Sequence, residues 1–211
     1  MPVETRVLER PGDRGPAGPV AGDGGRSFGR PGDANDRPEV NPLRIGAWLV
    51  VGAAIVLFAA FTSTYLTRRV QSDWRVGPLP PILWANTAVL LASSAVIEWA
   101  RRAARTQGAG VRPILGLATL LGAAFLVGQI VAWRELVAAG VYLAANPHAD
   151  FFYLLTGAHA VHLAVGVGAL AYALGQIRPV GGASGLVGAV AIYWHFVDVL
   201  WLYIFAILFW I

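Results

Sequence analysis

The sequence contains no cysteine and no lysine, and charged residues make up only 13% of it. The lack of cysteine excludes disulfide bonds, thiolate metal sites and covalent haem attachment through a Cys-x-x-Cys-His motif. Soluble domains carry about 25% charged residues, so the scarcity of charge argues against an ordinary soluble protein. All 16 basic residues are arginines, and the formal net charge is +4. We expect no nucleic-acid binding, because the arginines lie in loops and in an N-terminal tail, where membrane topology explains them.

Apolar residues make up 56% of the chain and gather in five long runs. At 1.5 Å per residue, each run gives roughly 27–40 Å of helix, enough to cross a hydrocarbon core of about 30 Å. The runs are continuously apolar and do not alternate, which excludes the strands of a barrel. The predicted fold is therefore all-α, an integral membrane bundle of five transmembrane helices at about 44–66, 82–99, 113–136, 151–174 and 185–211.

The first 43 residues differ in composition from the rest. Residues 1–42 hold 7 of the 13 prolines and 8 of the 25 glycines, and they contain no apolar run. Such a segment cannot bury enough apolar surface to offset the entropy of ordering. We predict a disordered Pro/Gly/Arg-rich cytoplasmic tail at 1–43, with a partner-docking arm as the alternative, followed by a membrane domain at 44–211.

The distribution of arginine predicts the orientation. With the N-terminus in the cytoplasm, 12 arginines lie on the inner side and 4 on the outer side. If only Arg44 and the loops are counted, 6 arginines lie on the inner side and 4 on the outer side. Cytoplasmic loops carry the excess of positive charge, so we expect a multi-pass protein of the bacterial plasma membrane with its C-terminus on the outer side.

A few ionisable and amide side chains lie within the apolar runs. His159 and His162 are three residues apart in the fourth run, and His195 and Asp198 have the same spacing in the fifth, so each pair shares a helix face. Gln129 lies in the third run. Because polar groups in lipid must find partners, we predict that these five residues form a buried polar network. Candidate hydrogen-bonding neighbours are Ser93 and Ser94.

The histidines also raise the question of a metal or haem site, since imidazole binds iron and copper. The chain has four histidines, and we expect His148 in an outer loop. A haem-copper catalytic subunit needs six histidine ligands. We therefore predict no catalytic, cofactor-binding or metal-binding residue, with proton conduction or haem ligation by the same histidines as alternatives.

Several aromatic and charged side chains of the runs are candidate surface contacts. Glu98 lies beside Arg101 and Arg102, which predicts an interfacial ion pair or a snorkelling side chain. Candidate lipid or interface contacts are Trp48, Glu98, Trp99, Arg101, Trp194 and Trp201.

Five motifs in order resemble subunit III of haem-copper terminal oxidases, in the bacterial five-helix form of cytochrome c oxidase subunit 3. The resemblance covers about residues 44–211. The motifs are Gly46–Arg69, Trp84-x-Asn86-Thr87 with Ser93-Ser94, Phe125-Leu126-x-Gly128-Gln129 with Ala132-Trp133, Phe151–Gly166, and Tyr193–Leu202.

The resemblance implies a non-redox subunit of a proton-pumping respiratory oxidase. Haem and copper would lie in the partner subunits I and II, and this chain would have no soluble substrate of its own. Implied roles are stability, delivery of protons and oxygen, and phospholipid binding. Many relatives carry a membrane-buried Glu on the first helix, where this chain has Ala54, so roles that rest on that carboxylate are not carried over.

The resemblance leaves alternatives open for the electron donor and for the complex that this chain joins. The block Phe61–Arg69 looks more like the cytochrome c oxidase forms, which favours cytochrome c as the donor. Quinol oxidases and nitric oxide reductases have five-helix relatives, so subunit III of a quinol oxidase and an accessory protein for nitric oxide reduction are alternatives. A small proton-coupled transporter that uses His162, His195 and Asp198 is a third reading.

Overall fold

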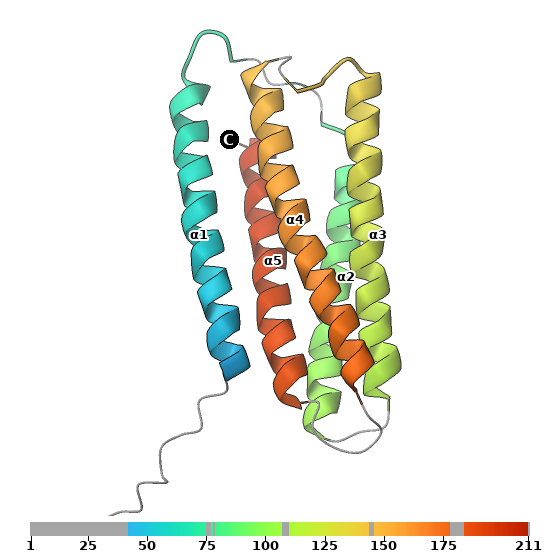
Figure 1. Ribbon diagram of the computed structural model, residues 1–211. Coiled ribbons are helices and arrows are strands. Elements are labelled where there is room, and N and C mark those ends of the chain that lie inside the picture. Colours follow the sequence, from blue (N-terminus) through green and yellow to red (C-terminus); the bar gives the residue numbers. More distant parts are fainter. Residues whose placement is uncertain are drawn as a thin grey trace, which may run out of the picture. The chain divides into compact units, whose positions relative to one another are not determined.

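The structure, a computed structural model, describes residues 42–74, 77, 79–106, 110–143, 146–177 and 184–210. This part of the chain contains five helices, each long and apolar enough to cross a membrane. Figure 1 labels them α1 to α5. The predicted all-α fold with five spanning helices is confirmed, while the predicted tail at 1–43 lies almost entirely outside the described residues. The bounds are α1 (Pro42–Arg69), α2 (Ile82–Arg105), α3 (Val111–Ala138), α4 (Pro147–Gln176) and α5 (Ser184–Trp210).

Several helices begin earlier or end later than their apolar runs. α2 continues past Trp99 to Arg105, because arginines outside the hydrocarbon core extend the helical ladder while keeping their charges in a polar layer. α4 begins at Pro147, directly after Asn146, whose side chain accepts a hydrogen bond from the Ala149 N–H at 2.9 Å. This cap places His148 in the first turn of α4, where it is buried. The expectation that His148 lies in an outer loop is therefore wrong.

Four of the helices close into a ring. α2 packs against α3, α3 against α4 and α4 against α5, and α5 packs back against α2. Among the described helices, α1 contacts α4 and α5 and has no contact with α2 or α3. Figure 1 shows α1 as the outermost helix on one side, next to α5 and α4. α5 is accordingly the most enclosed span, with 56% of its apolar window buried.

Trp194 of α5 contacts the three other helices of the ring. Its indole Nε1 donates a hydrogen bond to Ser93 Oγ on α2 at 3.0 Å. One edge of the ring lies where a Cβ on Gly122 of α3 would be, so that a methyl group there would overlap it. The neighbouring edge of the same six-membered ring lies against Gly166 of α4, where an added Cβ would be 3.1 Å from Cε3. Two glycines thus form the slot that the indole fills.

Trp201, two turns further along α5, repeats this arrangement. Its Nε1 donates to Thr87 Oγ1 on α2 at 2.9 Å. Its ring centroid is 4.9 Å from that of Phe125 on α3 and 5.0 Å from that of His159 on α4. Both Trp194 and Trp201 are fully buried within the bundle, so the expectation that they contact lipid is wrong. The hydroxyl partners on α2 explain the difference, because they satisfy the indole N–H groups inside the bundle.

The slot around Trp194 predicts the effect of single methyl groups. We expect Gly122→Ala and Gly166→Ala each to lower the free energy of unfolding by about 1–3 kcal/mol, because the rigid indole cannot move away from the added carbon. Thermal unfolding of the detergent-solubilised chain measures this. Gly116→Ala and Gly168→Ala on the same two helices are matched controls, since a Cβ there meets nothing within 4 Å. Equal behaviour of all four variants would contradict the slot.

Candidate functional site

Polar side chains of α2 and α5 meet in the part of the bundle where α2 ends and α5 begins. Ser94 Oγ and His195 Nδ1 are 2.7 Å apart, which makes a hydrogen bond and confirms Ser94 as a neighbour of this histidine. His195 Nε2 lies 3.6 Å from Glu98 Oε2. His195 is about 16 Å along α5 from its first residue, which is close to the middle of a spanning helix.

Glu98 links this pair to the arginines at the end of α2. Arg101 donates to both carboxylate oxygens, from Nε at 2.7 Å and from Nη2 at 2.8 Å. Arg102 Nε donates to Oε1 at 3.0 Å. The ion pair expected of Glu98 is therefore formed. We call this row of neighbouring side chains, Ser94, His195, Glu98 and Arg101, the α2–α5 polar chain.

Asp198 lies one turn beyond His195 on α5 and is buried. Ser94 is near its carboxyl group, but the Ser94 hydroxyl pairs with His195, and both Asp198 oxygens have no hydrogen-bond partner. Asp198 is thus close to the polar chain without being joined to it. A buried carboxyl group is costly without a polar partner, and the Ser94 hydroxyl is the polar group near it.

His159 and Gln129 form a separate group between α4 and α3. The Phe125 ring packs edge-on against His159 with centroids 5.9 Å apart, and Trp133 Nε1 donates to Thr156 Oγ1 at 3.1 Å. These two contacts fix the register of α3 on α4, and Gln129 lies midway between them on the same face of α3. Both nitrogens of His159 and both polar side-chain atoms of Gln129 are buried without a hydrogen-bond partner.

His162 belongs to a third place, between α4 and α1. Its Nδ1 lies 2.8 Å from a carbonyl oxygen of its own helix, and its ring packs edge-on against Phe58 of α1. The Tyr193 hydroxyl donates to the backbone oxygen of His162 at 3.0 Å. Within the described part of the chain, no hydrogen bond joins His162 to His195 or Asp198. Among the described residues, no hydrogen bond joins any two of the five residues predicted as one network, so the network stays a prediction.

This separation bears on metal binding. Among the described residues, no three His, Cys, Asp or Glu side chains come together in a way that could hold a metal ion. The groups that do meet are a hydroxyl, an imidazole, a carboxylate and a guanidinium in a row. Such a row can bind a polar partner.

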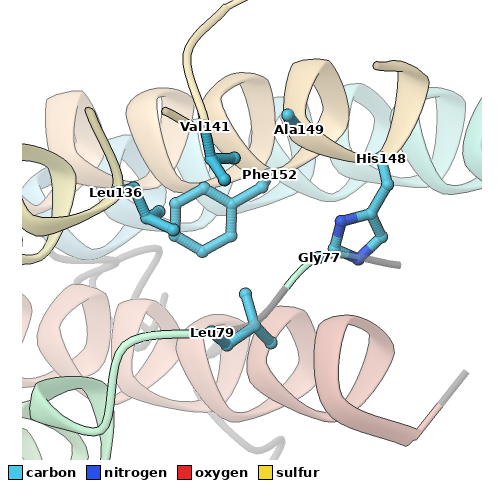
Figure 2. A pocket seen from close by; sticks show the side chains of 7 residues that line it. All are labelled: Gly77, Leu79, Leu136, Val141, His148, Ala149 and Phe152. Atoms are coloured by element: carbon cyan, nitrogen blue, oxygen red, sulfur yellow. The ribbon is translucent and has the colours of Figure 1, made fainter. Parts of the chain in front are cut away.

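A small cavity lies at the opposite end of the bundle, where α4 begins. Figure 2 shows the His148 ring beside it, directed toward the segment that carries Gly77 and Leu79. Trp74 packs edge-on against the same ring, with centroids 5.5 Å apart. The cavity has about 10 Å³, close to the minimum for one water and far too small for an organic substrate. Its lining comprises Gly77, Leu79, Leu136, Val141, His148, Ala149 and Phe152.

The surface residues predicted to contact lipid divide into two kinds. Trp48 and Trp99 are exposed, so lipid contact at these positions stays a prediction. Arg101 is half-buried and held by Glu98. The approach of Glu98 to His195 is not indicated by the sequence, because spacing along one helix says nothing about its register on another.

Comparison with known proteins places this chain among respiratory membrane subunits. A family model described as cytochrome c oxidase subunit III matches residues 37–211. Cytochrome c oxidase subunit 3 of Corynebacterium diphtheriae is 31% identical over 193 residues, covering 84% of this chain and 91% of the relative. The subunit 3 of Synechocystis is 30% identical, covering 85% and 80%. That of Bacillus sp. strain PS3 is 30% identical, covering 78% and 84%.

The geometry around Glu98 predicts a measurable contribution to stability. We expect Glu98→Gln to lower the free energy of unfolding by about 1 kcal/mol, because the half-buried Arg101 guanidinium loses its charged partner. Denaturant titration of the purified chain in detergent checks this. Glu135→Gln, at an exposed glutamate on α3, is the matched control and should be neutral. An unchanged Glu98→Gln variant would show that the ion pair adds nothing.

Proposed function

The chain belongs to the cytochrome c oxidase subunit III family, and we propose that within the oxidase it is a membrane scaffold that stabilises the catalytic subunit and supports proton and oxygen delivery to it. As a member of this family, it is a non-catalytic subunit of the cytochrome c oxidase complex. The family carries no metal centre itself. The oxygen reduction that the scaffold serves takes place on haem and copper in the partner.

The interlocked core is the observation that supports a scaffold role. Trp194 and Trp201 each join α5 to the other three helices of the ring by a hydrogen bond and close ring contacts. Such a core favours a fixed shape over the hinged or broken helices of a transporter. The α2–α5 polar chain supports a role near proton uptake, because it runs from the arginine-rich end of α2 toward the middle of the membrane.

Family membership supports a proposal for the partners and for the electron donor. We propose contacts with oxidase subunits I and II and with membrane phospholipid. Cytochrome c is the favoured electron donor, on the strength of the Phe61–Arg69 block and of the names of the relatives. A cytochrome c oxidase of this kind serves aerobic respiration at the plasma membrane.

Purification of the tagged chain in mild detergent tests the proposal. We expect a haem-bearing, multi-helix subunit to co-purify, and the eluate to consume oxygen when supplied with reduced cytochrome c. A visible spectrum, peptide mass spectrometry and oxygen uptake provide the readouts. The same complex stripped of this chain should begin at a similar rate and lose activity sooner during turnover.

Each part of the proposal has its own contrary result. A colourless chain that purifies alone would refute the subunit assignment and favour the transporter reading. Oxygen uptake driven by quinol and not by cytochrome c would overturn the donor. A stripped complex that keeps its activity as long as the intact one would overturn the scaffold role.

The proposed orientation, with the N-terminus in the cytoplasm, can be tested on a chain that has no native cysteine. Val70 at the end of α1 and Thr106 at the end of α2 are both exposed. We expect a membrane-impermeant maleimide to label Val70→Cys in cells with an opened outer envelope and to label Thr106→Cys only after the plasma membrane is permeabilised. The reverse pattern would invert the topology.

A further inference from the structure

The surface where α2 meets α5 carries polar groups that lie within the two apolar spans. The His195 side chain is 38% exposed there and the Glu98 side chain 24%. Helical spacing puts apolar residues on the same face, Leu91 on α2 and Val199 and Leu202 on α5, and all three are exposed. We call these five residues and Ser94 the His195 face.

Nothing in the described part of the chain covers this face. α1 packs on α4 and α5 and does not contact α2, so it does not cross the seam between α2 and α5. Figure 1 shows α1 away from α2, with α5 between them. The partial exposure of His195 is therefore a property of the bundle itself.

The imidazole of His195 has one hydrogen-bonding group to spare. Nδ1 is taken by Ser94, whereas Nε2 is 3.6 Å from the Glu98 carboxylate, too far for a hydrogen bond. Glu98 itself already accepts three hydrogen bonds from arginines. A carboxylate on the Nε2 side favours the tautomer with the proton on Nε2, and the Ser94 hydroxyl then donates to Nδ1. Nε2–H is left as a donor at the surface.

Lipid does not satisfy such a donor. Hydrocarbon tails offer no acceptor, and an unpaired polar group facing them is unfavourable by several kcal/mol. A second copy of the chain, docked through the same face, would bring a second donor and a second carboxylate that is already paired. The face fits an apolar helix that carries one acceptor.

We propose that the His195 face is the docking site for a transmembrane helix of another oxidase subunit, which presents a hydroxyl, amide or carboxyl oxygen to Nε2 of His195. Leu91, Val199 and Leu202 supply the apolar contacts of that helix. This inference rests on the proposed function, because it requires an assembled oxidase.

Site-specific photo-crosslinking in the intact complex tests the docking site. A benzophenone amino acid is placed at Val199, which is 64% exposed on α5, and in separate variants at Val161 on α4 and Leu120 on α3, which are 64% and 66% exposed. We expect the probe at 199 to crosslink to a spanning helix of another subunit. The probes at 161 and 120 serve as matched surface controls and should capture mainly lipid.

A crosslink from position 199 to lipid, in a complex that has assembled with its haem, would overturn the docking site and leave the proposed function intact. A wild-type chain that assembles with no haem-bearing partner would refute the proposed function, and the docking site with it. The two failures are therefore distinguished by the haem content of the eluate.

Substitutions of His195 give an independent readout. We expect His195→Leu to reduce the haem-bearing partner co-purified per tagged chain by about fivefold to tenfold, which corresponds to one lost hydrogen bond. His195→Gln keeps an N–H donor and should restore most of the yield. Thermal unfolding of the chain alone shows whether each variant is folded. A folded His195→Leu chain that recovers the partner in full would contradict the proposal.

Discussion

The fit of Trp194 between Gly122 and Gly166 is the contact on which the arrangement of the helices depends. In a bilayer there is little hydrophobic force between helices, because lipid tails are as apolar as leucine, so close packing and hydrogen bonds must hold them together. The indole does both, since its N–H reaches Ser93 while its two edges fill the space that the glycines leave. One side chain of α5 thereby fixes the distances to α2, α3 and α4.

The polar chain between α2 and α5 is a consequence of that packing. Trp194 and Trp201 bond to hydroxyls on α2 at two levels, which sets the antiparallel register of the two helices. In this register Ser94 faces His195 at 2.7 Å, and the next turn of α2 brings Glu98 to the other side of the imidazole. A shift by one turn would keep every residue on its helix face and separate these groups. The site therefore depends on core packing that is not itself polar.

The sequence predicts well what depends on one helix. The five spans follow from continuous apolar runs, and the Glu98–Arg101 pair follows from a spacing of three residues. The sequence does not predict the contacts that depend on how two helices pack against each other. Tryptophan is a residue type that is typical of the membrane interface. Only its contacts with the glycines on α3 and α4 and with the serine on α2 make Trp194 a core residue. His162 and His195 are not in contact for the same reason. Their similar depth along two helices does not determine which neighbouring helix each side chain faces.

Burial separates the ionisable groups by the kind of role that each can have. His159 and Gln129 are enclosed between α3 and α4, where no partner subunit can reach them, so their effect is confined to the bundle. The His195 side chain is partly exposed, with Nδ1 held by Ser94 and Nε2 lying 3.6 Å from the Glu98 carboxylate. In a subunit that performs no chemistry of its own, a polar group acts on the reaction only through what docks against it. If another subunit docks on the His195 face as proposed, His195 is the position that couples the interior of this chain to the rest of the oxidase.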